Sequence, residues 1–294
     1  MKSASESKLF STNRTLNIRG RLLDLTIPKV MGVLNVTPDS FYDGGRFTTD
    51  EALLNQVRKM IDEGATFIDV GAYSSRPGAK DISQDEELIR AVHAIRLIVK
   101  EFPQTVISID TFRSAVASAA IQEGASLIND ISAGELDSKM FETVSNLKVP
   151  YIAMHMRGTP ENMNKLSSYE NLIKDVTDYF HQKIYALHQL GVKDIIIDPG
   201  FGFAKTIQQN FDLLNNLDYF KILGMPIMTG LSRKSMIWKT LQINPEAALN
   251  GTTALNTIAL LKGANILRVH DVKEAVEVVK LVSSTRSQVS QEGY

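Results

Sequence analysis

The feature that most constrains this fold is a motif that recurs four times along the chain. In each copy a glycine ends a helical pattern, a short apolar run follows, and polar side chains close the run. The copies read EGATFIDVG from Glu63, EGASLINDIS from Glu123, LGVKDIIIDPG from Leu190 and KGANILRVHD from Lys262. Glycine accepts the left-handed backbone with which many helices end. The motif therefore predicts alternating strands and helices, with these glycines at helix ends: Gly64, Gly124, Gly191 and Gly263.

Four more apolar runs have the same character and bring the predicted strands to eight. They are residues 30–35, 106–110, 151–156 and 226–230. Helices are predicted at 49–63, 85–101, 112–123, 138–147, 169–190, 207–221, 235–262 (broken near Pro245) and 272–289. Eight such units predict an α/β fold, the (β/α)₈ TIM barrel. A doubly wound sheet competes with it, but functional-looking residues end nearly every strand instead of gathering at one switch point.

The N-terminal segment is expected to differ from the rest. Residues 15–25 alternate between apolar and polar side chains around a glycine. This pattern predicts a short N-terminal β-hairpin outside the barrel, which acts as a plug or a lid. We expect residues 15–290 to form one domain and residues 1–14 to be disordered.

The charge balance argues against a polyanionic or membrane partner. The chain has 32 Lys and Arg residues against 33 Asp and Glu, a net charge of −1. A small molecule is therefore the expected ligand, with no nucleic acid and no membrane as partner. The absence of cysteine excludes disulfides and thiolate metal sites and fits a reducing compartment. No segment reads as a secretion signal or reaches membrane-spanning length, so we expect a cytoplasmic protein.

Polar side chains follow nearly every predicted strand. In a TIM barrel these strand ends meet at one mouth, where the active site lies. The set comprises Asn35, Asp69, Asp110, Asn129, His155, Asp198, Lys234, Arg268 and His270. An ionised carboxylate only accepts hydrogen bonds, so Asp110, Asn129 and Asp198 favour a ligand ring with several N–H donors, such as an aminopyrimidinone or a purine. The alternative is that these side chains cap the helices that follow their strands.

Three basic side chains predict an anion site beside this set. Arg268 and His270 are two residues apart on the last strand and face the same way, and Lys234 follows the seventh strand. Loops after the last two strands of such barrels commonly bind phosphate. The chain has no GxxxxGK[ST] and no GxGxxG motif, which excludes a P-loop and a Rossmann site. The alternatives are a surface ion pair for Arg268, a core position for His270 and a Schiff-base role for Lys234.

Two polar loops follow the first two predicted strands, at residues 36–47 and 72–83. They fit loops that close over a reaction and exclude water, although an ordinary surface loop is the alternative. The histidines on predicted helices have no partner at metal-ligand spacing. A hard cation held by Asn35, phosphate oxygens and water still fits this region.

Seven segments carry a family resemblance. They are NVTPDSF from Asn35, SSRPGA from Ser74, SIDTF from Ser108, INDIS from Ile128, DPGFGF from Asp198, SRKS from Ser232 and RVHDV from Arg268. In this order, over roughly residues 15–285, they resemble the dihydropteroate synthase family. The resemblance implies a TIM-barrel transferase that joins (7,8-dihydropterin-6-yl)methyl diphosphate to 4-aminobenzoate in folate biosynthesis and releases diphosphate. It further implies Mg²⁺ as cofactor, a homodimer, and a target of sulfonamides.

The resemblance also implies roles for individual residues, motif by motif. The pterin would contact Asp110, Asn129, Met154, Asp198 and Lys234. The diphosphate would contact Asn35, Ser75, Arg268 and His270, with Mg²⁺ at Asn35. The 4-aminobenzoate would contact Phe41, Pro77, Phe203, Arg233 and Ser235. Catalytic roles would fall to Asp39, Asp110, Lys234, Arg268 and His270.

One segment departs from the family pattern. GAYSSRPGA stands where GGESTRPGA is usual, with Tyr73 in place of Glu and Ser75 in place of Thr. The hydroxyl group is kept at position 75. We therefore expect activity, while the details of this loop stay open.

The implied reaction starts with loss of diphosphate from an electron-rich dihydropterin, which leaves a cationic methylene group for the amine to attack. We expect ordered binding, in which the 4-aminobenzoate site forms only after the pterin and diphosphate sites are filled. Two other functions stay open, a pterin-binding methyltransferase barrel and a non-catalytic pterin-binding paralogue. The first would have no reason to keep the PDSF and SRPG loops or the Arg-x-His pair, and the second would lose the anion-binding residues.

Overall fold

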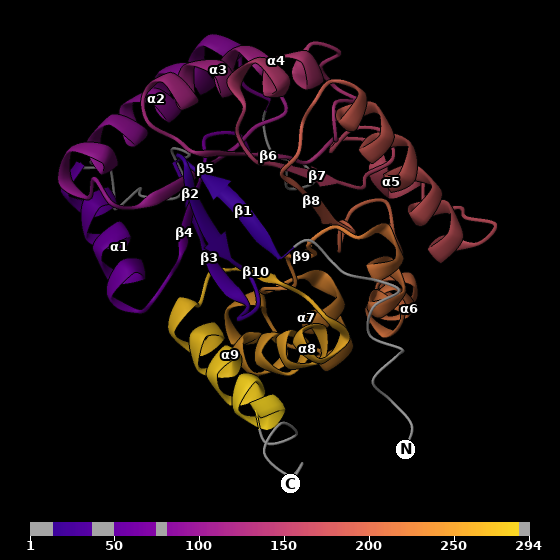
Figure 1. Ribbon diagram of the computed structural model, residues 1–294. Coiled ribbons are helices and arrows are strands. Elements are labelled where there is room, and N and C mark those ends of the chain that lie inside the picture. Colours follow the sequence, from indigo (N-terminus) through magenta and orange to yellow (C-terminus); the bar gives the residue numbers. More distant parts are fainter. Residues whose placement is uncertain (1–13, 37–49, 75–80, 288–294) are drawn as a thin grey trace, which may run out of the picture.

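Eight parallel strands form a barrel with helices around its outside (Figure 1). The computed structural model describes residues 14–36, 50–74 and 81–287. The barrel strands are β3 (Lys29–Asn35), β4 (Phe67–Gly71), β5 (Val106–Asp110), β6 (Leu127–Asp130), β7 (Tyr151–Met154), β8 (Ile195–Asp198), β9 (Met228–Thr229) and β10 (Ile266–Val269).

Nine α-helices and three 3₁₀-helices accompany the strands in the described part of the chain. The α-helices are α1 (Asp50–Asp62), α2 (Gln84–Glu101), α3 (Ser114–Gln122), α4 (Met140–Leu147), α5 (Leu172–Gln189), α6 (Ile207–Asn215), α7 (Ser235–Leu241), α8 (Leu249–Lys262) and α9 (Val272–Ser287). The 3₁₀-helices are η3 (Met163–Lys165), η4 (Leu217–Leu223) and η5 (Pro245–Ala247). None of the helices in this described part is long and apolar enough to cross a membrane.

The order of the strands closes the barrel. Hydrogen-bonded neighbours run β8-β7-β6-β5-β4-β3-β10-β9, all parallel. A parallel bridge between Ile197 and Ile227 joins the two ends of this series. The predicted TIM barrel is therefore confirmed, and the doubly wound sheet is wrong because such a sheet keeps two open edges.

The repeated glycines lie where the motif predicts. Each ends a helix and has a positive φ, which is 98° at Gly64, 110° at Gly124, 79° at Gly191 and 106° at Gly263. The expected break near Pro245 is also present, since α7, η5 and α8 divide residues 235–262. Two predicted elements are shorter than expected. The helix at 207–221 becomes α6 and the 3₁₀-helix η4, and the strand at 226–230 keeps only Met228 and Thr229 as regular strand.

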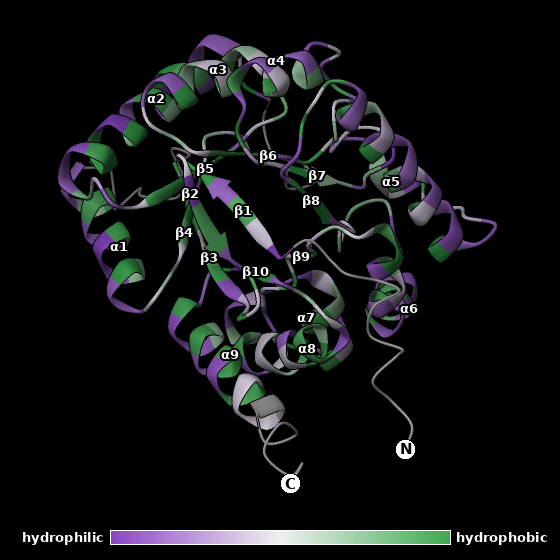
Figure 2. Cartoon of the chain, in the orientation of Figure 1, coloured by the Kyte–Doolittle hydropathy of each residue, from purple (hydrophilic) through white to green (hydrophobic). Residues whose placement is uncertain are grey.

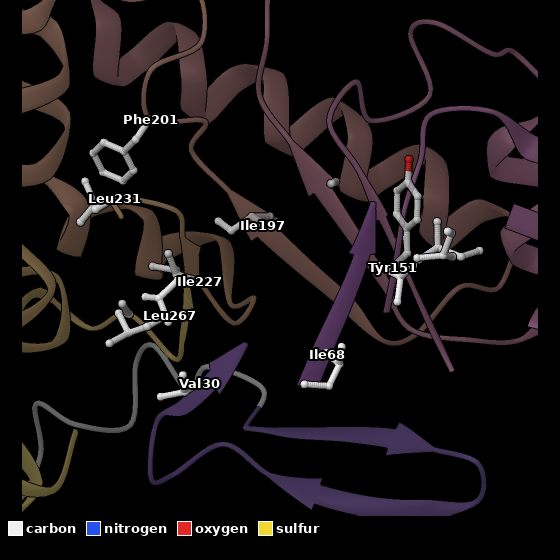
Figure 3. Packing of buried hydrophobic residues seen from close by; sticks show 14 of the residues in the cluster. Val30, Ile68, Tyr151, Ile197, Phe201, Ile227, Leu231 and Leu267 are labelled. Atoms are coloured by element: carbon white, nitrogen blue, oxygen red, sulfur yellow. The ribbon is translucent and has the colours of Figure 1, made fainter. Parts of the chain in front are cut away.

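Most of the core lies between the barrel and its helices. Every second strand residue points outward, and these side chains meet apolar faces of the helices, whose green and purple bands are visible in Figure 2. Ile197, Ile227 and Leu267 come from adjoining strands and lie close to Phe201 and Leu231 in this layer (Figure 3). The apolar strand runs of the sequence are thus covered on both faces, as parallel strands require.

The N-terminal hairpin fills the amino end of the barrel. It consists of β1 (Thr15–Ile18) and β2 (Arg21–Asp24), and β1 crosses the middle of the ring in Figure 1. The turn residues Arg19 and Gly20 both have positive φ, as a two-residue hairpin turn of this type needs. Side chains from this segment pack against interior residues of the barrel strands; the cluster is Leu16, Ile18, Leu25, Met31, Phe67, Leu127, Ile152, Ile196, Met228 and Ile266. The expectation that the hairpin plugs the barrel is confirmed. The alternative, a lid, is wrong because the hairpin lies at the amino end of the barrel.

Candidate active site

Strand pleating decides which polar side chains reach the carboxyl-end mouth of the barrel. Side chains two residues apart on a strand share a face. Leu127, Ile196 and Ile266 belong to the interior cluster, so the residues two positions later also point inward. These residues are Asn129, Asp198 and Arg268. The two-residue alternation of side chains along each strand therefore also identifies which residues line the mouth.

Arg268 is the centre of the site. Its Nε lies 2.6 Å from Oδ2 of Asp69, and a terminal nitrogen lies 2.6 Å from Oδ2 of Asp110. The Arg268 side chain is 21% exposed, whereas Asp69 is completely buried. The alternative considered for Arg268, a surface ion pair, is wrong because both partners are inside the mouth. One guanidinium therefore holds carboxylates from two different strands.

The same Asp69 oxygen also organises an amide. Nδ2 of Asn129 lies 3.0 Å from Oδ2 of Asp69, so this oxygen accepts from both Asn129 and Arg268. The second oxygen of Asp69 is buried and has no hydrogen-bond partner among the described residues. Asn129 itself is 3% exposed. The amide carbonyl of Asn129 is consequently held in a fixed direction by a partner that does not reach the solvent.

Two carboxylates have raised pKa values. Burial raises the pKa of Asp110 to about 7, with Asp69 adding to the shift and Arg268 opposing it. Burial also raises the pKa of Asp198, and the backbone N–H of Gly200, 2.8 Å from its Oδ1, opposes that shift. Neither residue caps a helix, because Arg113 and Thr206 occupy the cap positions of the following helices. The capping alternative is therefore wrong for both.

An apolar wall stands beside these polar groups. Met154, Phe203 and Ile131 are buried in one cluster at the mouth, with Met156, Met163 and Ala204. Nζ of Lys234 lies 4.4 Å from the centre of the Phe203 ring, a cation–π arrangement. A flat ring with polar edges fits between such a wall and the carboxylates. Ile131, Met156 and Met163 were not predicted as site residues. Ile131 and Met156 each directly follow a polar residue near a strand end, whereas Met163 lies on η3 and has no such signal.

The predicted anion residues have different surroundings. His270 is exposed at the mouth, with Nδ1 3.0 Å from Oγ of Ser232, so the core alternative for His270 is wrong. Arg233 makes a two-pronged ion pair with Asp271, at 2.7 and 3.0 Å. Ser235 begins α7 and is partly buried. Arg233 is thus aligned by a carboxylate, while His270 has contact with solvent.

Asn35 ends β3 at the same mouth. Its amide oxygen faces Gly71, and a Cβ added to that glycine would lie 3.7 Å from it and 3.6 Å from the Asp110 carboxylate. In residues 14–36, 50–74 and 81–287 no three His, Asp or Glu side chains converge as a metal site. Mg²⁺ commonly takes only one or two protein ligands and fills its shell with phosphate oxygens and water. The amide oxygen of Asn35 is a donor of the kind that fits this ion.

His155 does not join the mouth, which corrects the expectation for it. Met154 points inward, so the next residue points outward, and the His155 ring packs edge-on against Tyr179 of α5 at 4.9 Å. Burial and the nearby Lys205 hold the pKa of His155 well below its usual value. Lys205 was not predicted as a site residue. Its only sequence signal is its position directly after the DPGFGFA segment.

Tyr73, the departure from the family pattern, has a defined environment. Its ring meets Phe112 edge-on at 5.1 Å, and the Arg113 guanidinium lies 5.4 Å from its centre. Arg113 also bonds Glu87, which is fully buried on α2, at 2.7 Å. Burial, with Asp81, raises the pKa of Tyr73. An aromatic contact therefore stands where the usual sequence has a carboxylate.

Four of the predicted site residues belong to the two polar loops. Asp39, Phe41, Ser75 and Pro77 lie outside the described residues. The expectation of ordered binding rests on these loops and stays a prediction. The other predicted residues lie at or near the carboxyl ends of the barrel strands, in the loops that follow them, or, for Ser235, at the start of α7. They are Asn35, Asp110, Asn129, Met154, Asp198, Phe203, Arg233, Lys234, Ser235, Arg268 and His270.

Comparisons with known proteins agree with this geometry. The family model described as "Pterin binding enzyme" matches residues 31–270. Dihydropteroate synthase from Escherichia coli (strain K12) is 40% identical over 274 residues, which cover 92% of this chain and 95% of that protein. Dihydropteroate synthase from Bacillus subtilis (strain 168) is 40% identical over 257 residues, 87% of each chain.

Solved structures show the same similarity. Dihydropteroate synthase from Yersinia pestis, in a complex with a sulfonamide drug, has a TM-score of 0.87 and 39% identity, covering 93% of this chain and 99% of that one. The enzyme from Xanthomonas albilineans with 4-aminobenzoic acid has a TM-score of 0.87 and 36% identity, covering 94% of this chain and 99% of that one.

Proposed function

The chain belongs to the dihydropteroate synthase family of pterin binding enzymes, and from this we propose how its residues divide the reaction of that family. The substrates are a dihydropterin methyl diphosphate and 4-aminobenzoate, and the products are dihydropteroate and diphosphate. The observation that carries the proposal is the Arg268 guanidinium held between Asp69 and Asp110 at the mouth. It places a fixed cation beside carboxylates that can accept from a ring.

The pterin ring is assigned to the polar floor. Asp110 and Asp198 present acceptors, and Asn129 presents an amide whose direction Asp69 fixes. These groups match a ring edge with neighbouring N–H donors, since ionised carboxylates accept and never donate. Met154 supplies the apolar face, and Lys234 supplies a further donor beside it. Burial of this floor supports recognition of a flat, uncharged heterocycle.

The diphosphate and the amine take the outer part of the mouth. Arg268 in β10, His270 directly after it and Asn35 at the end of β3 are assigned to the diphosphate. The family resemblance adds Ser75 to this set. Arg233, Ser235 and Phe203 are assigned to the 4-aminobenzoate. The family resemblance adds Phe41 and Pro77. The guanidinium of Arg233 suits the carboxylate of that substrate.

The residues favour a stepwise reaction. The bond between the methylene carbon and the diphosphate oxygen breaks, and its electron pair leaves with the diphosphate. Arg268 and His270 stabilise the departing negative charge, while Asp110 and Asp198 stabilise the positive pterin. The nitrogen of 4-aminobenzoate then forms the new C–N bond with its lone pair and gives up a proton. An arylamine is neutral at pH 7, so the reaction needs no strong base beside it. The family resemblance assigns Asp39 a catalytic role in the first polar loop.

Mg²⁺ is proposed as the cofactor. Asn35 would hold it together with oxygens of the diphosphate, and the ion would supply positive charge to the leaving group. The chemistry of the amide oxygen and its place beside the Asp110 carboxylate support this assignment.

A homodimer is proposed as the assembly. Leu241 of α7 packs beside Gly251 of α8, and Ile258 and Leu261 follow on α8 at helical spacing. Leu241 and Leu261 are 52% and 58% exposed, respectively. Exposed apolar side chains on these two adjacent helices favour a second copy as partner. Leu261→Glu should convert a dimer to monomer in light scattering, while Leu22→Glu on the exposed hairpin strand should not; a parent chain that is already monomeric contradicts the proposal.

The activity is tested by diphosphate release from the pterin substrate, with and without 4-aminobenzoate. We expect release with Mg²⁺ and formation of dihydropteroate only when the amine is present. A methyltransferase-type barrel would bind pterin and release no diphosphate. A non-catalytic paralogue would bind the pterin diphosphate and leave it intact, so either result overturns the proposal.

A further inference from the structure

Lys205 lies in the turn between β8 and α6 and makes three hydrogen bonds there. Its Nζ is 3.0 Å from Nδ1 of His155, 3.0 Å from the carbonyl oxygen of Gly200 and 3.1 Å from that of Phe203. An ammonium group has three N–H donors and no acceptor. In its ammonium form Lys205 therefore gives one donor to each partner, and burial lowers the pKa of this lysine to about 7.

The backbone of this turn needs such support. Gly200, Gly202 and Ala204 have φ of 72°, 81° and 49°, so half of the six residues from Gly200 to Lys205 are left-handed. For alanine this conformation costs on the order of 1 kcal/mol. The carbonyls of Gly200 and Phe203 both accept from Lys205, and that of Gly200 also accepts from the N–H of Phe203. The side chain thus holds the turn together from within.

This turn carries two groups of the active site. The N–H of Gly200 donates to Oδ1 of Asp198 at 2.8 Å. The ring of Phe203 lies in the apolar wall beneath Lys234. A shift of the turn would therefore move a carboxylate and an aromatic ring at the same time.

His155 connects the turn to the neighbouring strand. Its Nδ1 lies 3.0 Å from Nζ of Lys205, and burial, with Lys205, lowers the pKa of the imidazole well below its usual value. When Lys205 carries its proton, it donates to this nitrogen. The backbone N–H of His155 donates to the carbonyl of Asp198 at 2.9 Å. A Cβ at Gly200 would collide with the carbonyl of His155 at 2.0 Å, so the two segments pack backbone against backbone. Lys205 bonds both segments, through His155 on one side and through the carbonyls of Gly200 and Phe203 on the other.

We propose that Lys205 is a positioning residue, which fixes the places of Phe203 and Asp198 through the turn and does not touch substrate. The inference rests on the proposed function, because it assigns these two groups to substrate binding. Displacing a positioning group by about 1 Å can cost on the order of 100-fold in rate. Lys205→Met keeps an unbranched side chain one atom shorter than lysine and removes its donors. We expect kcat/KM to fall 10- to 100-fold, with the larger part in the KM for the amine substrate.

The chain offers a selective way to restore the ammonium. It contains no cysteine, so Lys205→Cys introduces the only thiol. Alkylation of the unfolded variant with 2-bromoethylamine, followed by refolding, gives a lysine-like side chain with a sulfur in its stem. Methylthiolation of the same variant gives a side chain of methionine-like shape without donors. Exposed Lys193, treated in the same way, is the matched control.

The positioning role predicts that the aminoethylated protein recovers KM and kcat and the methylthiolated protein does not. Equal activity of the two forms, whether high or low, overturns the inference. If neither form refolds, His155→Phe decides, because it removes one acceptor and keeps an aromatic ring against Tyr179. We expect His155→Phe to raise the KM for the amine by less than Lys205→Met does. An unchanged KM overturns the positioning role. A parent chain that releases no diphosphate would instead contradict the proposed function.

Discussion

Arg268 and Asp69 meet at 2.6 Å across two strands that have β3 between them, and the same carboxylate oxygen also receives the amide of Asn129. Asp69 touches none of the proposed substrates in this assignment, yet it directs two residues that do. The Arg268 guanidinium donates to Asp69 through Nε and to Asp110 through a terminal nitrogen. Three strands are thus coupled through one cation, and substitutions at its partners should have separable effects.

Asp69→Asn should lower the free energy of unfolding by about 3 kcal/mol. Breaking a buried ion pair costs roughly 3 to 5 kcal/mol, and Arg268 retains Asp110 as a second partner. Urea denaturation measures the loss. Asp271→Asn breaks the partly exposed pair with Arg233 and should cost less than about 1 kcal/mol. Equal losses in the two variants would show that Asp69 contributes no more than an exposed partner does.

Arg268→Ala should weaken binding of diphosphate and of the pterin diphosphate while sparing the unphosphorylated pterin. A lost hydrogen bond to a charged group is worth on the order of 1.5 to 3 kcal/mol. Calorimetry with the three ligands measures the difference, and Lys193→Ala, at an exposed position, serves as control. If all three ligands lose affinity equally, Arg268 supports the fold or the ring and not the leaving group.

Asp198→Asn should nearly abolish pterin binding. The amide replaces an acceptor with a donor that faces the ring N–H groups, and a buried unsatisfied donor costs roughly 1 to 3 kcal/mol. Asp218→Asn, on η4 and bonded to Lys262, is a control far from the mouth. Calorimetry with the unphosphorylated pterin decides, and parent-like affinity would remove Asp198 from the pterin site.

Pterin binding should weaken as the pH falls below about 7. The pKa of Asp110 is raised to about 7 in the free protein, and N–H donors of the ring bind its ionised form. The affinity for pterin should therefore be highest above this pKa and decline below it. At pH 6 Asp110 is mostly protonated in the free protein, so binding should release its proton. Calorimetry at pH 6 in buffers of different ionisation enthalpy detects that proton. Asp110→Asn should bind weakly without proton release, and a parent chain that releases no proton contradicts the assignment.

The period of the strands explains why much of the site was predictable. Asp110, Asn129 and Asp198 each end an apolar run with inward parity, so sequence alone placed them together. His155 was misplaced because it is the last polar residue of its run, whereas the inward residue is Met154. The pair of Arg233 and Asp271 could not be foreseen, since 38 residues separate them and their approach depends on how two loops pack. Lys205 was not predicted for a related reason, because two of its three partners are backbone carbonyls, which every residue has.

The hairpin that plugs the barrel has a consequence for the order in which the chain acquires its structure. Leu16, Ile18 and Leu25 are among the first described residues, but their partners extend along the chain as far as Ile266 on β10. Contacts of such large sequence separation form late, because each must first overcome the entropy of closing a long loop. We therefore expect the hairpin to become fully buried only once the final strand has joined the ring. Protection of its backbone amides against hydrogen exchange during refolding would therefore mark the moment at which the barrel closes.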